Sequence, residues 1–179
     1  MRFLYHTAAF LRPLLALSFL TVLGQSVWAS ASTESRVGDF SLLDAHGYFH
    51  SMSWYDDHRA LVFLSHSLSD TSMAAAIGRF EELAKEHADS FEFFLIDSQG
   101  LHNRSAITIA LSELGSELPV LMDDAQLIGE ALKLSHSGEF VVFDPRSFTV
   151  IGRGQHLDSQ SALLEGLLSA LASDSDTAA

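Results

Sequence analysis

The sequence predicts an α/β domain built around a strand, a helix and a second strand that returns beside the first. Residues 60–64 (Ala-Leu-Val-Phe-Leu) form an apolar run with the length and composition of a buried strand. After a polar loop, apolar residues recur at helical spacing between Met73 and Ala84. Residues 91–96 supply the returning strand, and crossovers of this kind almost always leave the two strands parallel.

The rest of the chain continues this alternation of strands and helices. We expect a hairpin at 36–52 with its turn at Asp44–Gly47, a helical turn capped by Ser53, helices at 103–114 and 125–134, a closing antiparallel hairpin at 139–154, and a last helix at 159–171. The residues expected to face the core are Ile107, Ile109, Ala110 and Leu114 in the helix at 103–114, and Leu163, Leu164, Leu167, Leu168 and Leu171 in the last helix. No repeat or low-complexity linker interrupts the pattern, so we predict one domain at 37–172 and a disordered polar tail at 173–179.

Residues 1–31 have the pattern of a secretory signal peptide. Arg2 and Arg12 give a basic start, residues 13–23 form an apolar core, and small residues offer a cleavage site near Ala29 and Ala31. The apolar core is shorter than the roughly 20 residues that a membrane span requires. We therefore expect an exported protein, periplasmic or secreted, that is not stably inserted in the membrane after cleavage. An uncleaved anchor is the alternative.

The composition describes an acidic globular protein. The formal net charge is −13, and hydrophobic residues make up 47% of the chain. A surface of this charge repels nucleic acid and anionic lipid. Neither is an expected partner.

The chain contains no cysteine. An exported protein folds in a compartment that permits disulfides, and this one does without them. Mechanisms that need a thiolate nucleophile, a disulfide or a cysteine-ligated metal are therefore excluded.

The order of elements resembles the thioredoxin-like superfamily, and more closely its redoxin branch of thiol peroxidases and periplasmic thiol-disulfide proteins. Four segments carry the resemblance: Val37–Phe40 with the hairpin after it, the strand–loop–helix unit, Pro119–Leu121, and the closing hairpin whose first strand ends at Asp144. It extends over residues 37–171. It implies a three-layer α/β/α sandwich with a central mixed sheet of four or five strands and an N-terminal β-hairpin extension.

The same resemblance implies a redox site that this chain lacks. The family carries a Cys-x-x-Cys pair just before the first long helix. Counting back from Leu83 places the pair at Ser69 and Ser72, and alignment from the preceding strand moves its first position nearer Leu68. The position of the family's cis-proline corresponds to Gly138 in this chain. A cis peptide bond is energetically much less favourable before glycine than before proline. We therefore expect a different backbone there and a family substrate surface that has been abandoned.

We interpret Ser69 or Ser72 as a helix N-cap rather than as a nucleophile. A catalytic hydroxyl needs an adjacent general base, and His66 is the only candidate nearby in the sequence. The polar loop needs a cap in any case. We therefore assign no catalytic residue.

The remaining chemical signal is a set of scattered histidines. Under the implied fold, His66 and His136 lie on two loops that face each other, with Asp70 and His102 near the same edge. Imidazoles with a carboxylate suit Cu(II) or Zn(II). The competing interpretation is a set of ordinary surface histidines. That is how we interpret His46, His50 and His58 on the hairpin and after it.

Three functional hypotheses remain open. The first is a non-catalytic, cysteine-free periplasmic protein that serves as a binding or assembly module for a protein partner, without a cofactor. The second is a histidine-based copper or zinc binding or chaperone protein on the same fold. The third is an enzyme of non-thiol chemistry. The sequence displays no polar constellation that would support the third, so we favour the first.

Overall fold

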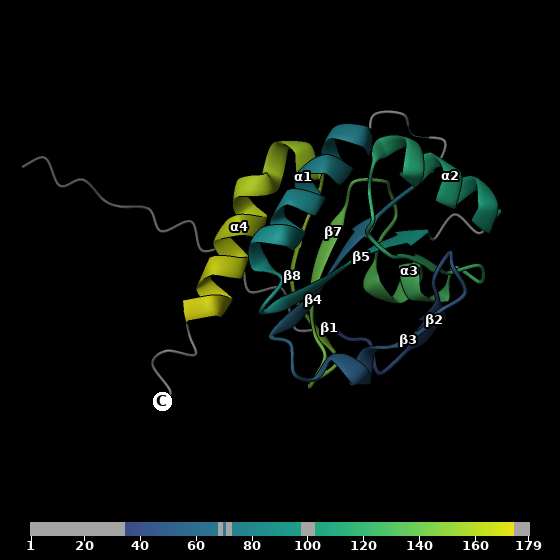
Figure 1. Ribbon diagram of the computed structural model, residues 1–179. Coiled ribbons are helices and arrows are strands. Elements are labelled where there is room, and N and C mark those ends of the chain that lie inside the picture. Colours follow the sequence, from purple (N-terminus) through teal and green to yellow (C-terminus); the bar gives the residue numbers. More distant parts are fainter. Residues whose placement is uncertain (1–34, 68–69, 71–72, 98–102, 174–179) are drawn as a thin grey trace, which may run out of the picture.

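The computed structural model describes residues 35–67, 70, 73–97 and 103–173. These residues form a mixed six-stranded sheet in the order β1-β8-β7-β4-β5-β6, with helices on both faces (Figure 1). The strands are β1 (Ser35–Arg36), β4 (Ala60–Ser65), β5 (Phe91–Asp97), β6 (Val120–Met122), β7 (Phe140–Asp144) and β8 (Thr149–Gly154). The predicted signal peptide and residues 174–179 of the predicted tail lie outside the described residues.

The predicted strand–helix–strand unit supplies two interior strands of the sheet, β4 and β5. β4 and β5 are parallel neighbours in register from Ala60 opposite Phe91 to Ser65 opposite Ile96. Every residue of β4 is buried, because it has a helical layer on one face and the hairpin side on the other. The crossover between the two strands is α1 (Met73–His87). The prediction for this unit is confirmed.

The sheet has more strands than the four or five predicted. β6 extends it parallel to β5, and the two-residue β1 pairs antiparallel with β8 at the other edge. β1 has only two residues and β6 only three, too few for either to show a strand periodicity of its own. They are strands because a neighbouring edge offers them backbone partners, which local sequence does not reveal.

One face of the sheet is covered by α1, α2 (Arg104–Leu114) and α4 (Leu157–Ser173). In α2 the structure buries Ile107 and Leu111, whereas Ile109 and Leu114 are exposed, so the predicted core stripe is right for Ile107 and wrong for Ile109 and Leu114. Asn103 caps α2 by accepting the backbone N–H of Ser105 at 2.8 Å. In α4, Leu164 and Leu168 are buried and Leu163 is exposed. No helix among the described residues is long and apolar enough to cross a membrane.

The other face is covered by α3 (Leu127–Leu132), the hairpin of β2 (Ser41–Leu43) and β3 (Phe49–Ser51), and the 3-10 turn η1 (Met52–Tyr55). The predicted N-terminal hairpin is confirmed, with Ser41 opposite Ser51. Its turn is held by Asp44 Oδ1, which accepts the backbone N–H groups of His46 and Tyr48 at 2.8 Å each. Two helical or hairpin layers around one mixed sheet give the expected three-layer α/β arrangement.

The predicted capping role of Ser53 is wrong. Ser53 lies inside η1, and Ser51 precedes the turn without a side-chain cap. The backbone N–H of Ser53 is instead bonded to Asp39 Oδ1 at 3.1 Å. A residue from the segment between β1 and β2 therefore satisfies this turn.

Candidate functional site

The two loops that the sequence placed at one edge of the sheet do meet there. Gly138 donates its backbone N–H to the carbonyl of Ser65 at 2.9 Å, and Ser65 donates its own to the carbonyl of Glu139 at 2.8 Å. The carboxyl end of β4 is thus tied to the segment that leads into β7. Ser69 and Ser72 lie outside the described residues, so their capping role stays a prediction.

Gly138 adopts a backbone conformation that proline cannot adopt. Its φ is +84°, and all peptide bonds of the described residues are trans. Proline fixes φ near −65°, and the left-handed region favours glycine over every other residue. A Cβ at this position would lie 3.7 Å from Met73 Sδ, which is an ordinary contact. The backbone angle, rather than lack of space, therefore explains glycine here.

A cleft of about 510 Å³ opens at this edge. Its base is the first part of α1, with Met73 and Ala76. Its walls come from the loop after β4, the segment before β7 and the start of α4. The lining residues are Ser67, Asp70, Met73, Ala76, Ser135, His136, Ser137, Gly138, His156 and Asp158. They include two imidazoles and two carboxylates.

The structure brings only one of the two predicted histidines to the cleft. His136 lines it with a side chain that is 77% exposed, and its Nδ1 lies 3.4 Å from Glu139 Oε1. His66 is 3% exposed and is absent from the described cleft lining. Among the described residues, no group of three or more histidine, cysteine or acidic side chains is placed to hold a metal. His102 lies outside them.

His156 joins the cleft without having been singled out in the sequence. It has a positive φ of 52° and immediately precedes α4. The next residue, Leu157, donates its backbone N–H to the carbonyl of Gly138 at 3.0 Å. This bond between segments 19 residues apart sets His156 beside the loop of His136. No local pattern signals such a pairing.

A second polar cluster lies under the hairpin, where the sequence suggested only surface histidines. That interpretation is wrong for His50, whose side chain is 15% exposed. Its Nδ1 lies 2.6 Å from the hydroxyl of Tyr55, and its Nε2 lies 3.2 Å from Asp44 Oδ2. A carboxylate can only accept, so in the neutral imidazole Nε2 carries the proton and Nδ1 accepts from Tyr55. The ring also packs edge-on against Phe94.

Burial and neighbouring negative charges keep the hydroxyl of Tyr55 protonated. Burial, together with the negative charges of Glu92 and Asp44, raises the pKa of Tyr55 to about 12. The tyrosine therefore serves as a hydrogen-bond donor and is a poor nucleophile. Burial also raises the pKa of Glu92, whose Oε2 lies 3.5 Å from His58 Nε2. The cluster fastens the hairpin and η1 to β5, and its arrangement favours a structural role.

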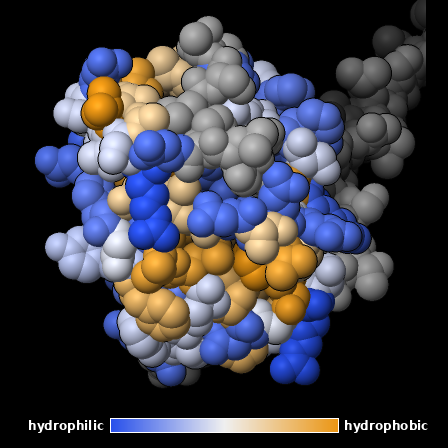
Figure 2. Space-filling view, turned by 90° about the vertical axis from the view of Figure 1, so that its right-hand side faces the viewer, coloured by the Kyte–Doolittle hydropathy of each residue, from blue (hydrophilic) through white to orange (hydrophobic). Residues whose placement is uncertain are grey.

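The hairpin side also exposes apolar surface. Figure 2 shows hydrophobic residues gathered on the face that lies to the right in Figure 1, where α2, α3 and the hairpin are found. Large exposed apolar or aromatic residues on the hairpin, η1 and α3 are Leu43, Tyr48, Phe49, Trp54 and Leu127. Phe49 and Trp54 contact each other edge to face, with ring centroids 5.3 Å apart. Such surface is typical of sites that contact other proteins.

Comparison with protein-family models gives no match, and comparison with curated proteins gives none either. Solved structures do match. The exposed lipoprotein thioredoxin of Streptococcus pneumoniae is 19% identical, with a TM-score of 0.62 over 73% of this chain and 98% of that one. A putative thiol:disulfide interchange protein DsbE from Chlorobium tepidum is 15% identical, with a TM-score of 0.64 over 79% and 99%. A putative protein disulfide isomerase from Bacteroides thetaiotaomicron is 14% identical, with a TM-score of 0.65 over 80% and 92%.

These likenesses extend over most of this chain and nearly all of each matched chain. At such low identity they establish the architecture and leave the activity open. Together with the sheet order and the layers, they identify the protein as a thioredoxin-like α/β fold whose sequence contains no cysteine.

Proposed function

We propose that this protein is an exported, non-catalytic thioredoxin-like module that binds a protein partner. The observation that carries the proposal is the edge of the sheet at Gly138. The fold and a cleft are retained there, but the chain has no thiol, and its glycine backbone does not suit proline. This edge therefore offers a cleft for contact without a group for thiol chemistry.

The polar groups of the cleft support recognition better than catalysis. His136 is largely exposed, so water competes for its nitrogen atoms and keeps its surroundings polar. His66, the base that the sequence offered for a serine mechanism, is buried away from the cleft. A binding surface needs only exposed, well-positioned groups of this kind.

Export and a protein partner are supported by independent features. The predicted leader at 1–31 supports export, and one of the similar structures is that of an exposed lipoprotein. The net charge of −13 disfavours nucleic acid and anionic lipid as partners. The apolar residues exposed on the hairpin side favour a protein.

The absence of cysteine provides a sharp test, because one introduced thiol is the only labelling site. Ser137→Cys places it in the cleft, and Glu86→Cys places it on the exposed far end of α1 as a matched control. Each variant carries a benzophenone maleimide and is illuminated in the exported fraction of its own cells. We expect one discrete cross-linked protein from position 137 that position 86 does not give. Identical products from both positions would refute a binding role for the cleft.

The purified wild-type protein tests for catalysis. The wild-type protein is expected to be inert in insulin reduction, disulfide isomerisation and peroxide turnover, since it has no thiolate to attack a disulfide or a peroxide. Turnover that persists after metal removal and rigorous purification would establish an enzyme of other chemistry.

A further inference from the structure

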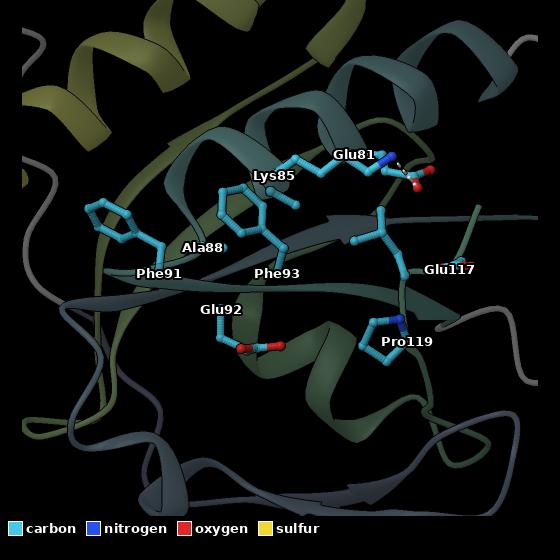
Figure 3. Close-up of a pocket in the computed structure, with 10 residues that line it drawn as sticks. Glu81, Lys85, Ala88, Phe91, Glu92, Phe93, Glu117 and Pro119 are labelled. Carbon is cyan, nitrogen blue, oxygen red and sulfur yellow. Dashed lines mark ion pairs between the residues drawn. The ribbon is translucent and has the colours of Figure 1, made fainter. Parts of the chain in front are cut away.

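A separate pocket lies at the other end of α1 from the cleft. It forms between the last turns of α1, the first residues of β5 and the segment that leads into β6 (Figure 3). Its volume is about 230 Å³, below the range of about 300–1,000 Å³ that small-molecule sites occupy. It therefore suits one side chain better than a cofactor.

The pocket exists because the helix presents small residues where the strand presents large ones. Ala84 of α1 and Ala88, which directly follows the end of that helix, both line the pocket opposite Phe93 of β5. Figure 3 shows Phe91 and Phe93 projecting from β5 on the side of α1, while Glu92 projects to the opposite side. The alanines leave unfilled the space that longer side chains would occupy. The walls are consequently apolar.

Carboxylates line the same pocket. The side chain of Glu81 is 14% exposed, and its ion-pair partner is Lys85, whose Nζ is 3.1 Å away (Figure 3). The Lys85 side chain is 76% exposed, so its ammonium group can return to water when another cation takes its place beside Glu81. Glu117 adds a second carboxylate from the segment before β6. An incoming cation can therefore replace Lys85 at Glu81 at small cost.

We propose that this pocket receives one arginine side chain from a basic segment of a partner protein. The apolar walls suit the methylene stem, and the guanidinium offers a planar fork of donors that matches the Glu81 carboxylate. Arginine is also more weakly hydrated than lysine, so it loses less on entering. The net charge of −13 attracts a basic segment from a distance. The inference rests on the proposed function for the existence of a protein partner, but the pocket itself is tested without one.

The test is an NMR titration of the isotope-labelled protein with acetyl-Gly-Gly-Arg-Gly-Gly-amide. Control peptides carry citrulline, which has the same shape without the charge, or lysine. The arginine peptide is expected to shift the amide signals of residues 81–93 and 117–119, and to bind more tightly than either control. Equal affinities for arginine and citrulline, or for arginine and lysine, would overturn the proposal.

Two variants distinguish arginine binding in the pocket from general attraction of the peptide to an acidic surface. Glu81→Gln keeps the shape and should weaken arginine binding about tenfold, because it removes a charge-assisted hydrogen bond. Glu86→Gln makes the same charge change on an exposed site of the same helix outside the pocket lining, and should have less than a twofold effect. Equal losses from the two variants would mean long-range attraction only and would refute the site.

Ala88→Leu tests the pocket by filling it. Ala88 is exposed, so the larger side chain enters the pocket without disturbing the core. It should abolish binding of the arginine peptide with an unchanged unfolding midpoint, and unchanged binding would refute the site. Failure of the peptide to bind while position 137 still captures a partner would reject the pocket alone. Peptide binding without any capture at position 137 would reject the proposed role of the cleft alone.

Discussion

Two regions of this molecule hold histidines beside carboxylates, and they use them in opposite ways. In the cleft, His136 and His156 are exposed on loops. Under the hairpin, His50 is sheltered, with both ring nitrogens bonded and its face packed on aromatic rings. The two regions contain the same residue types, and they differ in how far the histidine side chains are shielded from solvent. The contrast shows that the hairpin layer is held by sheltered side-chain hydrogen bonds, whereas the histidines that line the cleft remain exposed.

The largest expected effect comes from removing the sheltered histidine. His50→Ala takes a hydrogen bond from the buried Asp44 carboxylate and another from Tyr55, together with the ring contacts, and should cost about 2–3 kcal/mol of unfolding free energy. His136→Ala, the matched change in the cleft, should cost less than about 0.5 kcal/mol because its side chain is exposed. Urea unfolding monitored by tryptophan fluorescence measures both. Equal losses would break the comparison.

The next effect tests the backbone of the cleft. Gly138→Ala puts a side chain at a φ of +84° and should cost about 1–2 kcal/mol. Ser137→Ala, the neighbouring control, should change the unfolding free energy by less than about 0.5 kcal/mol. A neutral Gly138→Ala variant would show that this loop relaxes freely, and that its shape is not built into the fold.

A smaller effect concerns pH and the hairpin cluster. The pKa of Tyr55 in the folded protein is raised to about 12, so the unfolded chain loses this proton first as the pH rises. The contribution of Tyr55 to stability is fully present below the unfolded tyrosine pKa of about 10 and is lost as the pH rises through 12. Tyr55→Phe should flatten the fall in stability between these values. Tyr48→Phe, at an exposed site on the same hairpin, should leave the fall unchanged in denaturation series at fixed pH.

The smallest expected effect is on metal binding at the cleft. Because the described residues hold no group of three ligands, Cu(II) and Zn(II) should bind weakly. Their affinity should fall further below about pH 6, where protons compete with the metal for the imidazoles. His136→Ala and His156→Ala should each change the affinity in calorimetric titrations by less than about twofold, like the control His46→Ala. A tenfold loss in either cleft variant would revive the histidine-based metal hypothesis. His66→Ala extends the test to the second histidine of that hypothesis.

Much of the architecture was predictable from the sequence, because its signals are local. The buried strand of β4, the amphipathic α1 and the returning β5 each carry their own pattern, and their pairing follows from chain connectivity. The hairpin turn follows from Asp44 and Gly47 in the same way. The exclusion of thiol chemistry needed only a count of cysteines.

Only the tertiary structure decided which polar residues are sheltered and which meet. The side chain of His50 is only 15% exposed because Phe94 of β5 and Tyr55 of η1 pack against it, and His156 reaches the cleft through a bond between Leu157 and Gly138. His66 was predicted to face His136, but it is buried and absent from the described cleft lining. Such burial depends on side chains far away in the sequence. Periodicity indicates the buried face of a strongly amphipathic helix such as α1, whereas the environment of a single histidine is set by the elements that pack around it.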